Sequence, residues 1–299
     1  MSYIHSVLSR PARISMDQGF ICASGILHFN KIPIEDLDSL ILDHSEITIS
    51  IQSLRALACH GVSVLICNKN HKPIGIYSPF ASHSHRLSKI SLQINQSKPR
   101  IKNLWKQIVQ QKIFNQGKCL VSVGKNDNVS VYAQNVRSGD SGNMEGVAAA
   151  RYFPSLFGKD FIRHQSDFIN SFLNYGYAVI RSSISRMIAV SGLEPFLGLF
   201  HHNEQNPWNL ADDLIEPFRP VVDLLASQYC HIDSEAALEQ EHRLKIVSLL
   251  ASDVLFMGER LPVSFAIEKT VQSLIQCFKD KTKKLSLPVL LPLSLHCYE

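Results

Sequence analysis

The chain has 299 residues, 45% of them hydrophobic and 19% charged, with a net charge of +4; this composition argues against extensive disorder and permits a nucleic-acid partner. Its 7 cysteines form no Cys-x-x-Cys pair, which disfavours a disulfide framework or a zinc ribbon and favours reduced thiols. No apolar run reaches the roughly 18 residues that cross a bilayer, and the N-terminus shows no secretory pattern, so we expect a cytoplasmic protein without a membrane partner.

The first part of the chain is predicted to consist mostly of strands. Isoleucines alternate with polar residues over 46–51, which is the period of two of a half-buried strand. Short apolar runs over 39–43 and 62–67 predict two more strands. Between them, the spacing of apolar residues over 52–60 predicts a helix that closes at Gly61.

From about residue 86 the pattern changes, because apolar residues now recur every three or four positions. The clearest helix is predicted over 167–190. The basic stretch 98–113 is a second candidate, with Pro99 suited to its first turn. A third helix is predicted over 235–256.

These patterns predict an α+β chain, with a small β-rich domain over 1–82 and a larger all-α domain over 86–299. The boundary is expected in the stretch 78–85, where Pro79 and several serines loosen the chain. The apolar segment 285–293 contains prolines that oppose a regular helix. It fits either a packed tail or a segment that docks into a partner protein.

Two places in the predicted helical domain combine metal-capable side chains with a helix end. Glu145 lies between Gly142 and Gly146 and precedes a run of helix-forming alanines. Taken alone, an ordinary acid at the positive end of a helix is the simpler interpretation. His201 and His202 end an apolar run, and they too could be histidines with ordinary hydrogen bonds.

A third place is the stretch around Asp213 and Glu216, which would share one helical face after Asn209 as N-cap. Pro217 is expected to end or kink this helix. Two like carboxylates repel each other unless they are protonated or bridged by a cation, although a structural pair neighboured by Arg219 is also possible. Together with an imidazole, two carboxylates suit Mn²⁺ or Mg²⁺ rather than calcium or thiolate-bound zinc.

In this order and spacing, these stretches resemble the CRISPR-associated integrase family, the core subunit of spacer acquisition. The resemblance spans nearly the whole chain, and the Asn-Leu-Ala-Asp-Asp sequence that begins at Asn209 is most similar to the type II branch. It rests on the segments 40–50, His60–Cys67, Asn143–Gly146, Asn174–Tyr177 and Asp213–Pro220.

The resemblance implies a metal site made of Glu145, His201 and Glu216. His201 is chosen over His202 because it closes a Gly-x-x-His run and precedes Glu216 by fifteen residues. Asp213 matches an acid that often accompanies these ligands and contacts them rather than the metal. His202 is then a neighbour that either contacts DNA or is simply exposed.

The family's activity would be metal-dependent joining of the 3′ ends of a prespacer to the CRISPR repeat by transesterification, with DNA cleavage when water replaces the 3′-hydroxyl. The resemblance also implies a homodimer formed through the N-terminal domain, double-stranded DNA as substrate, and a heterohexamer with a small companion adaptation protein. A type II effector nuclease is a further candidate partner. Candidates for phosphate contacts are Arg151, Arg181, Arg186 and Arg219.

Two other functions compete with this one. A DNA-binding scaffold could keep the fold without catalysis, and failure of manganese to support any joining or cleavage would favour it. An unrelated metal-dependent hydrolase could act on a small molecule. Steeply salt-dependent duplex binding would count against that hydrolase, because phosphate contacts release counterions.

Overall fold

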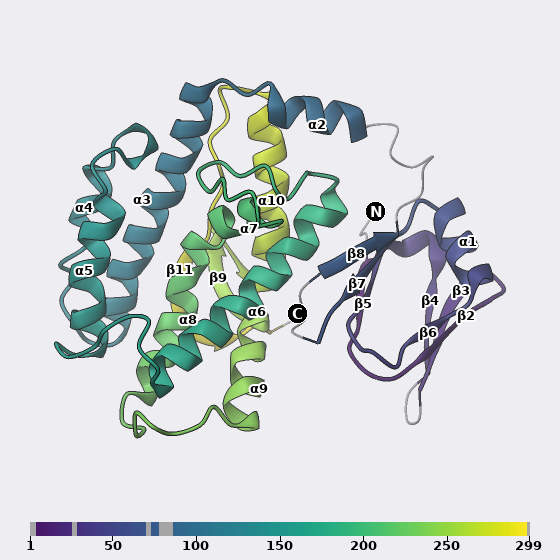
Figure 1. Ribbon diagram of the computed structural model, residues 1–299, viewed down its shortest axis with the longest axis horizontal. Helices are drawn as coiled ribbons and strands as arrows, with labels where there is room; N and C mark the ends of the chain where they lie inside the picture. Colours follow the sequence, from purple (N-terminus) through teal and green to yellow (C-terminus); the bar gives the residue numbers. More distant parts are fainter. Residues whose placement is uncertain (1–3, 26–28, 70–72, 78–85, 298–299) are drawn as a thin grey trace. The chain divides into compact units, whose positions relative to one another are not determined.

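The computed structural model describes residues 4–25, 29–69, 73–77 and 86–297 (Figure 1). It divides into two compact units, one made of Met1–Ser91 with Ile188–Glu194 and the other of Leu92–Met187 with Pro195–Glu299. The predicted domain boundary over 78–85 lies outside the described residues. Within the described ranges, no helix has the length and apolar character needed to span a membrane.

The first unit contains two four-stranded sheets. One has the order β1 (Ile4–Leu8), β5 (Leu37–Leu42), β7 (Ser63–Cys67) and β8 (Pro73–Tyr77), with only β8 antiparallel to its neighbour. The other has the order β4 (Phe29–Pro33), β3 (Phe20–Ser24), β2 (Arg13–Asp17) and β6 (Thr48–Ile49), with β6 parallel to β2. A short 3-10 turn, η1 (Ile34–Asp36), precedes β5.

The core of this unit is aliphatic and includes Ile14, Leu40, Leu57 and Val64. The strands predicted over 39–43 and 62–67 and the helix predicted over 52–60 are confirmed by β5, β7 and α1 (Ile51–Cys59). The strand predicted over 46–51 is mostly wrong, because β6 covers only Thr48–Ile49. Ser50 accepts a hydrogen bond from the Ser53 backbone N–H at 3.1 Å and thereby caps α1.

Helices dominate the rest of the chain. They are α2 (Arg86–Ile94), α3 (Lys98–Ser122), α4 (Val131–Gln134), α5 (Met144–Phe157), α6 (Phe168–Ser191), α7 (Asn209–Leu214), α8 (Arg219–Ala226), α9 (Gln240–Ser248) and α10 (Val263–Lys279). Short 3-10 turns lie between them: η2 (Ser138–Asp140), η3 (Glu216–Phe218), η4 (Ser227–Tyr229) and η5 (Leu249–Ala251). The helices predicted over 98–113 and 167–190 are confirmed by α3 and α6.

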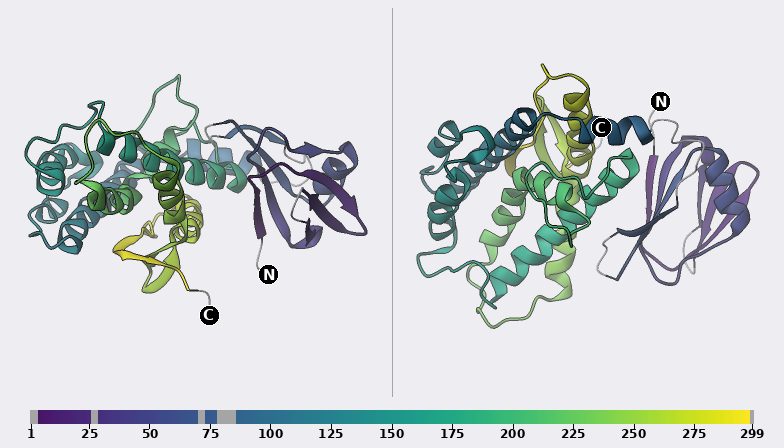
Figure 2. Two further views of the ribbon diagram at one scale, coloured as in Figure 1. Left: turned by 90° about the horizontal axis from the view of Figure 1, so that it is seen from below. Right: turned by 45° about the horizontal axis from the view of Figure 1, so that its top comes forward.

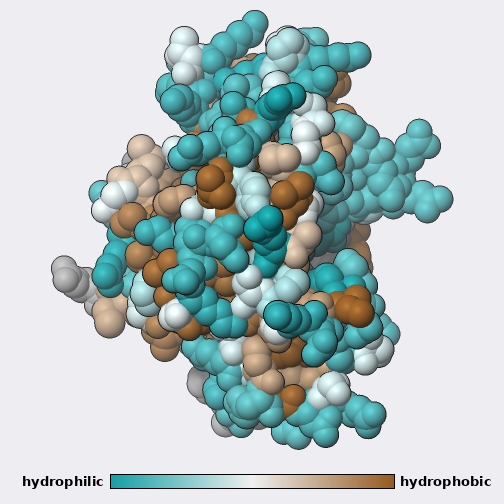
Figure 3. Space-filling view, turned by 90° about the vertical axis from the view of Figure 1, so that its left-hand side faces the viewer, coloured by the Kyte–Doolittle hydropathy of each residue, from teal (hydrophilic) through white to brown (hydrophobic). Residues whose placement is uncertain are grey.

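Helix α3 lies at the centre of the second unit, where it contacts α5, α7, α8 and η3. Its buried side chains include Trp105, Ile108 and Ile113. Ser97 caps the helix and Pro99 lies in its first turn, as predicted. On the side of the unit that carries α4 and α5, apolar residues lie among hydrophilic ones (Figure 3).

The helix predicted over 235–256 is wrong at its C-terminal end. After α9 the chain forms β9 (Ser252–Phe256), which pairs with β10 (Glu259–Pro262) and with β11 (Val289–Leu295). This three-stranded sheet lies to one side of the helices (Figure 2). The predicted α+β class is therefore confirmed, although the second part is mostly rather than entirely helical. The apolar tail packs on its own chain, with Leu290 buried in β11.

Helices α6 and α8 pack closely around a buried carboxylate. A Cβ atom at Gly176 would lie 2.3 Å from Cγ1 of Val222, so only glycine permits this approach. Asp223 on α8 accepts hydrogen bonds from the hydroxyls of Tyr177 on α6 and Tyr152 on α5. Burial raises the pKa of Asp223 to about 6 and outweighs the lowering effect of both hydroxyls.

This buried acid predicts a pH dependence of stability. Because its folded pKa exceeds the usual unfolded value of about 3.9, Asp223 favours the folded state less as the pH rises from about 4 to about 6. An asparagine side chain cannot ionise, so Asp223→Asn should gain roughly 2 kcal/mol relative to the wild type between about pH 4.5 and pH 7.5. Urea unfolding at both pH values measures this, and parallel pH curves for the two proteins would contradict it.

Candidate active site

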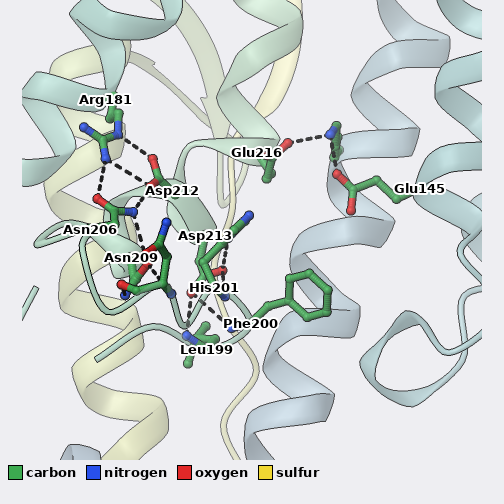
Figure 4. Close-up of polar contacts among 12 residues, drawn as sticks. Glu145, Arg181, Leu199, Phe200, His201, Asn206, Asn209, Asp212, Asp213 and Glu216 are labelled. Atoms are coloured by element: carbon green, nitrogen blue, oxygen red, sulfur yellow. Dashed lines mark hydrogen bonds and ion pairs between the residues drawn. The ribbon is translucent and has the colours of Figure 1, made fainter. Parts of the chain in front are cut away.

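Two of the predicted acids meet at one lysine. Glu145 at the start of α5 and Glu216 in η3 each place a carboxylate oxygen 2.5 Å from Nζ of Lys112 on α3 (Figure 4). The two oxygens are therefore no more than about 5 Å apart. Side chains from three separate segments thus converge on a single cationic point in the second unit, where the side chain of Glu216 is 5% exposed and that of Lys112 12% exposed.

Local structure fixes both acids against α3. Asp140 accepts hydrogen bonds from the backbone N–H groups of Met144 at 2.9 Å and Glu145 at 3.0 Å, which holds the first turn of α5. The helix ends before Pro217, as predicted, and the chain turns through η3. Asn115, which lies on α3 one turn after Lys112, donates a hydrogen bond to the Pro217 carbonyl at 2.7 Å.

Neighbouring cations keep Glu216 ionised. Burial opposes ionisation of Glu216, but the cations of Lys112 and Arg219 outweigh it and lower its pKa to about 2. Arg219 Nε donates to Oε1 of Glu216 at 2.9 Å. Burial likewise lowers the pKa of Lys112, and the carboxylates of Glu216 and Glu145 reverse this, so the pKa is raised overall. Glu216 and Lys112 therefore both carry a full charge at neutral pH.

His201 is held by Asp213, which is fully buried. Nδ1 of His201 lies 2.8 Å from Oδ1 of Asp213, whose oxygens also accept the backbone N–H groups of Leu199 at 2.5 Å, Phe200 at 3.2 Å and His201 at 3.2 Å. A Cβ atom at Gly198 would lie 2.8 Å from Asp213 Oδ2, so the loop needs glycine there. The hydrogen bond to Asp213 raises the pKa of His201 against the opposing effect of burial.

We expect Asp213→Asn to destabilise the protein by about 2–4 kcal/mol. The amide nitrogen of asparagine would face backbone N–H donors that the second carboxylate oxygen now satisfies. Loss of the negative charge should also lower the pKa of His201. Urea unfolding and an NMR titration of the histidines measure the two effects, with exposed Asp160→Asn as a control. An unchanged His201 titration would contradict the assignment.

The donor atoms fit a hard divalent cation, although the lysine ammonium lies between them. Oε2 of Glu216 is buried and faces the Lys112 ammonium at 2.5 Å. Because Nδ1 of His201 is engaged, Nε2 is the ring nitrogen left to bind a ligand. In the described ranges, no three His, Cys, Asp or Glu side chains are close enough to share one ion. An ion shared by Glu145 and Glu216 would take the place of the Lys112 ammonium, which would have to move aside.

The other predicted residues are placed as follows. Arg181 pairs with Asp212 and reaches Asn206 at 3.1 Å, and Arg219 pairs with Glu216. Both arginines are therefore already neutralised by carboxylates. Arg151 is exposed, with its guanidinium 5.7 Å from the Tyr132 ring, and His202 is also exposed. Arg186 is partly buried, with Ser182 Oγ 3.5 Å away.

Sequence reasoning missed Lys112 and Asn115. Lys112 lies at the end of the basic stretch 98–113, where a lysine is normally a solvated side chain, and nothing local marks it as buried. It also missed the parallel stack of Trp105 and Phe200, whose ring centroids are 4.5 Å apart beside His201. An aromatic residue directly before the histidine pair was the one available signal.

Comparison with known proteins agrees with this architecture. The family model described as CRISPR associated protein Cas1 matches residues 7–232. The chain is 38% identical over 278 residues to the CRISPR-associated endonuclease Cas1 of Neisseria meningitidis serogroup C, covering 90% of each protein. It is 25% identical to a Cas1 endonuclease of Pyrobaculum aerophilum, covering 90% of this chain and 96% of that protein.

Solved structures share the fold at lower identity. A casposase bound to its integration product has a TM-score of 0.71 at 20% identity, covering 95% of this chain and 97% of that one. A chain of a partial Cas6-RT-Cas1–Cas2 complex has a TM-score of 0.76 at 16% identity, covering 97% and 99%. Fold and sequence together place the protein among CRISPR-associated endonucleases. The chain belongs to the Cas1 family, which confirms the resemblance noted from its motifs.

Proposed function

We propose that this chain is the integrase of CRISPR spacer acquisition, which joins the 3′ ends of a captured DNA duplex to the CRISPR repeat. The observation that carries this proposal is the convergence of the Glu145 and Glu216 carboxylates on one cationic point. It occurs in a chain that is 38% identical to a CRISPR-associated endonuclease. When water takes the place of the 3′-hydroxyl, the same site would cleave DNA.

Glu145, Glu216 and Nε2 of His201 would hold Mg²⁺ or Mn²⁺. A divalent cation at this position would polarise the reacting phosphate and neutralise the charge that gathers on it. Arg219 holds Oε1 of Glu216, so Oε2 would coordinate the cation once the Lys112 ammonium has moved aside. The hydrogen bond between Asp213 and Nδ1 of His201 fixes the direction in which the other ring nitrogen, Nε2, points.

The chain's surface supports DNA and protein partners. Exposed Arg151 and His202, together with Arg186, are the basic residues that we assign to phosphate contacts. In the first unit, β8 is an edge strand on which Ile74 is 67% and Ile76 43% exposed, which supports self-association of residues 1–82 as a homodimer.

We further propose assembly with a small companion adaptation protein into a heterohexamer, with a type II effector nuclease as an additional partner. The likeness to a chain of a Cas1–Cas2 complex supports this assembly at the level of the fold. No disulfide joins the cysteines of the described residues, which supports a reducing compartment such as the cytoplasm.

A half-site integration assay tests the function. The purified chain would be mixed with a duplex prespacer and a leader–repeat target, with and without the companion protein, in magnesium and in manganese. We expect joined products that require both the metal and a free 3′-hydroxyl. Salt-dependent DNA binding without joining or cleavage in either metal would instead identify a catalytically silent scaffold.

A further inference from the structure

One buried side chain on α3 joins three separate segments of the second unit. Asn115 is 1% exposed. Its Nδ2 donates to the Pro217 carbonyl at 2.7 Å and to the Pro288 carbonyl at 3.0 Å. Its Oδ1 accepts the Leu290 backbone N–H at 3.1 Å and Nε2 of Gln111 at 3.0 Å. Helix α3, turn η3 and the start of β11 therefore meet at a single amide group.

The amide group of Asn115 has no hydrogen-bonding capacity left over. A primary amide carries two N–H donors and one oxygen with two lone pairs, and the four contacts use all of them. Because a buried polar group that loses its partner is costly, each of these contacts restrains the others. The Pro217 carbonyl therefore has a fixed place relative to α3. Leucine has a similar shape but could make none of the four hydrogen bonds.

The turn that Asn115 restrains carries one of the site's acids. Pro217 directly follows Glu216 in η3. Lys112 lies three residues before Asn115, on the same side of α3, and its ammonium is 2.5 Å from Oε2 of Glu216. Helix α3 thus holds η3 at two points, by an ion pair and by an amide hydrogen bond. The ion pair must open when a cation replaces the ammonium, whereas the hydrogen bond involves only the backbone of η3 and can persist.

The chain that leads into β11 is attached along the same side of α3. Arg100 Nη2 donates to the Lys283 carbonyl at 2.8 Å, and Gln107 Oε1 accepts the Leu285 backbone N–H at 2.8 Å. Arg100, Gln107 and Asn115 are seven and eight residues apart, which is about two helical turns each. Among the described residues, Gln107 makes no hydrogen bond with η3. Only Asn115 connects this C-terminal segment to the turn that carries Glu216.

We propose that Asn115 is a positioning residue of the active site, through which α3 and the C-terminal segment together hold Glu216 where it can bind a divalent cation. It acts through the Pro217 carbonyl and touches neither the metal nor DNA. The inference rests on the proposed function, because it concerns the metal site of Glu145, His201 and Glu216. Groups that support metal ligands from outside typically contribute about ten- to hundredfold to metal affinity or activity.

The test compares Asn115→Leu with Gln107→Leu. The first change removes the contacts with η3 and with the C-terminal segment, and the second removes only a contact with that segment. Asn115→Leu should weaken Mn²⁺ binding, measured by isothermal titration without DNA, roughly ten- to hundredfold. It should lower kcat for strand joining by a similar factor and leave KM for the duplex unchanged. Gln107→Leu should match the wild type in all three quantities, even where urea unfolding shows that both variants are destabilised.

Wild-type Mn²⁺ affinity and kcat in a folded Asn115→Leu protein would overturn the proposal, and so would equal losses in Gln107→Leu. If Asn115→Leu does not fold, Gln111→Leu replaces it, because Gln111 fixes which end of the amide faces the Pro217 carbonyl. Unchanged affinity and kcat in that variant also overturn the proposal. Strand joining that does not depend on Asn115 leaves the function intact and removes the positioning role. Mn²⁺ binding that depends on Asn115, in a wild type that neither joins nor cleaves DNA, does the reverse.

Discussion

Replacing Glu216 with alanine should reduce strand joining by about three orders of magnitude or more, while DNA binding largely persists. A ligand that positions a catalytic cation contributes several kcal/mol to the transition state, and each 1.4 kcal/mol is about tenfold in rate. Glu216 is nearly buried and shares its oxygens with Lys112 and Arg219, so its removal also takes away the carboxylate that pairs with both cations. Glu145→Ala and His201→Ala should have effects of the same kind.

The comparison should use purified proteins and a saturating concentration of Mg²⁺ or Mn²⁺. Glu216→Gln keeps the shape of the side chain and separates the loss of charge from the loss of packing. Glu259→Gln, at an exposed acid in β10, is the matched control and should join DNA as the wild type does. Full joining activity in Glu145→Ala, His201→Ala or Glu216→Ala would remove that residue from the catalytic site.

The fold was predictable wherever a local pattern determines the structure. The amphipathic spacing of the residues in α3 and α6 and the turn at Gly61 are properties of neighbouring residues. The end of the helix predicted over 235–256 could not be predicted from such a pattern, because Val254 and Phe256 also fit the spacing of an apolar helix face. What makes this segment a strand is its pairing with β11, which lies more than thirty residues further along the chain.

In the candidate site, too, local features could be predicted and features that depend on distant contacts could not. The ends of helices near Glu145 and Glu216 could be predicted, since the glycines and alanines around Glu145 and the ring of Pro217 act locally. Asn209 was predicted as an N-cap, but the structure places Trp208 at that position, and the Asn209 amide instead donates to the Phe196 and Asn203 carbonyls. This difference arises from contacts that the loop makes only after folding.

Lys112 is the residue of the cluster that no local pattern could identify. Its carboxylate partner Glu145 is 33 residues away along the chain, and Glu216 is further still. The sequence predicted that Asp213 and Glu216 would share one helical face and need either protonation or a bridging cation. In the structure Asp213 instead accepts backbone N–H groups of the loop 199–201, and Glu216 shares a cation with Glu145. The sequence could not show that the chain supplies a bridging cation of its own.

Because Lys112 supplies this cation, Lys112→Met should destabilise the protein without divalent metal but strengthen the binding of the metal. Without divalent metal, the variant should lose about 3–5 kcal/mol of unfolding free energy, because a nearly buried ion pair is broken and two carboxylates lose their shared counter-charge. With metal, the variant should bind Mn²⁺ about tenfold more tightly or better, because no ammonium competes for the same oxygens. Isothermal titration of Mn²⁺ and urea unfolding measure the two effects.

Linkage joins these measurements, since a ligand that binds only the folded state stabilises it by RT ln(1 + [L]/Kd). Saturating Mn²⁺ should therefore recover more stability in Lys112→Met than in the wild type, by about 1.4 kcal/mol for each tenfold difference in Kd. Lys106→Met, on the same helix but outside the acid cluster, should match the wild type. If the Mn²⁺ affinity of Lys112→Met is unchanged or weaker, the lysine and the metal do not compete for the same carboxylate oxygens, and a cation bound elsewhere must be considered.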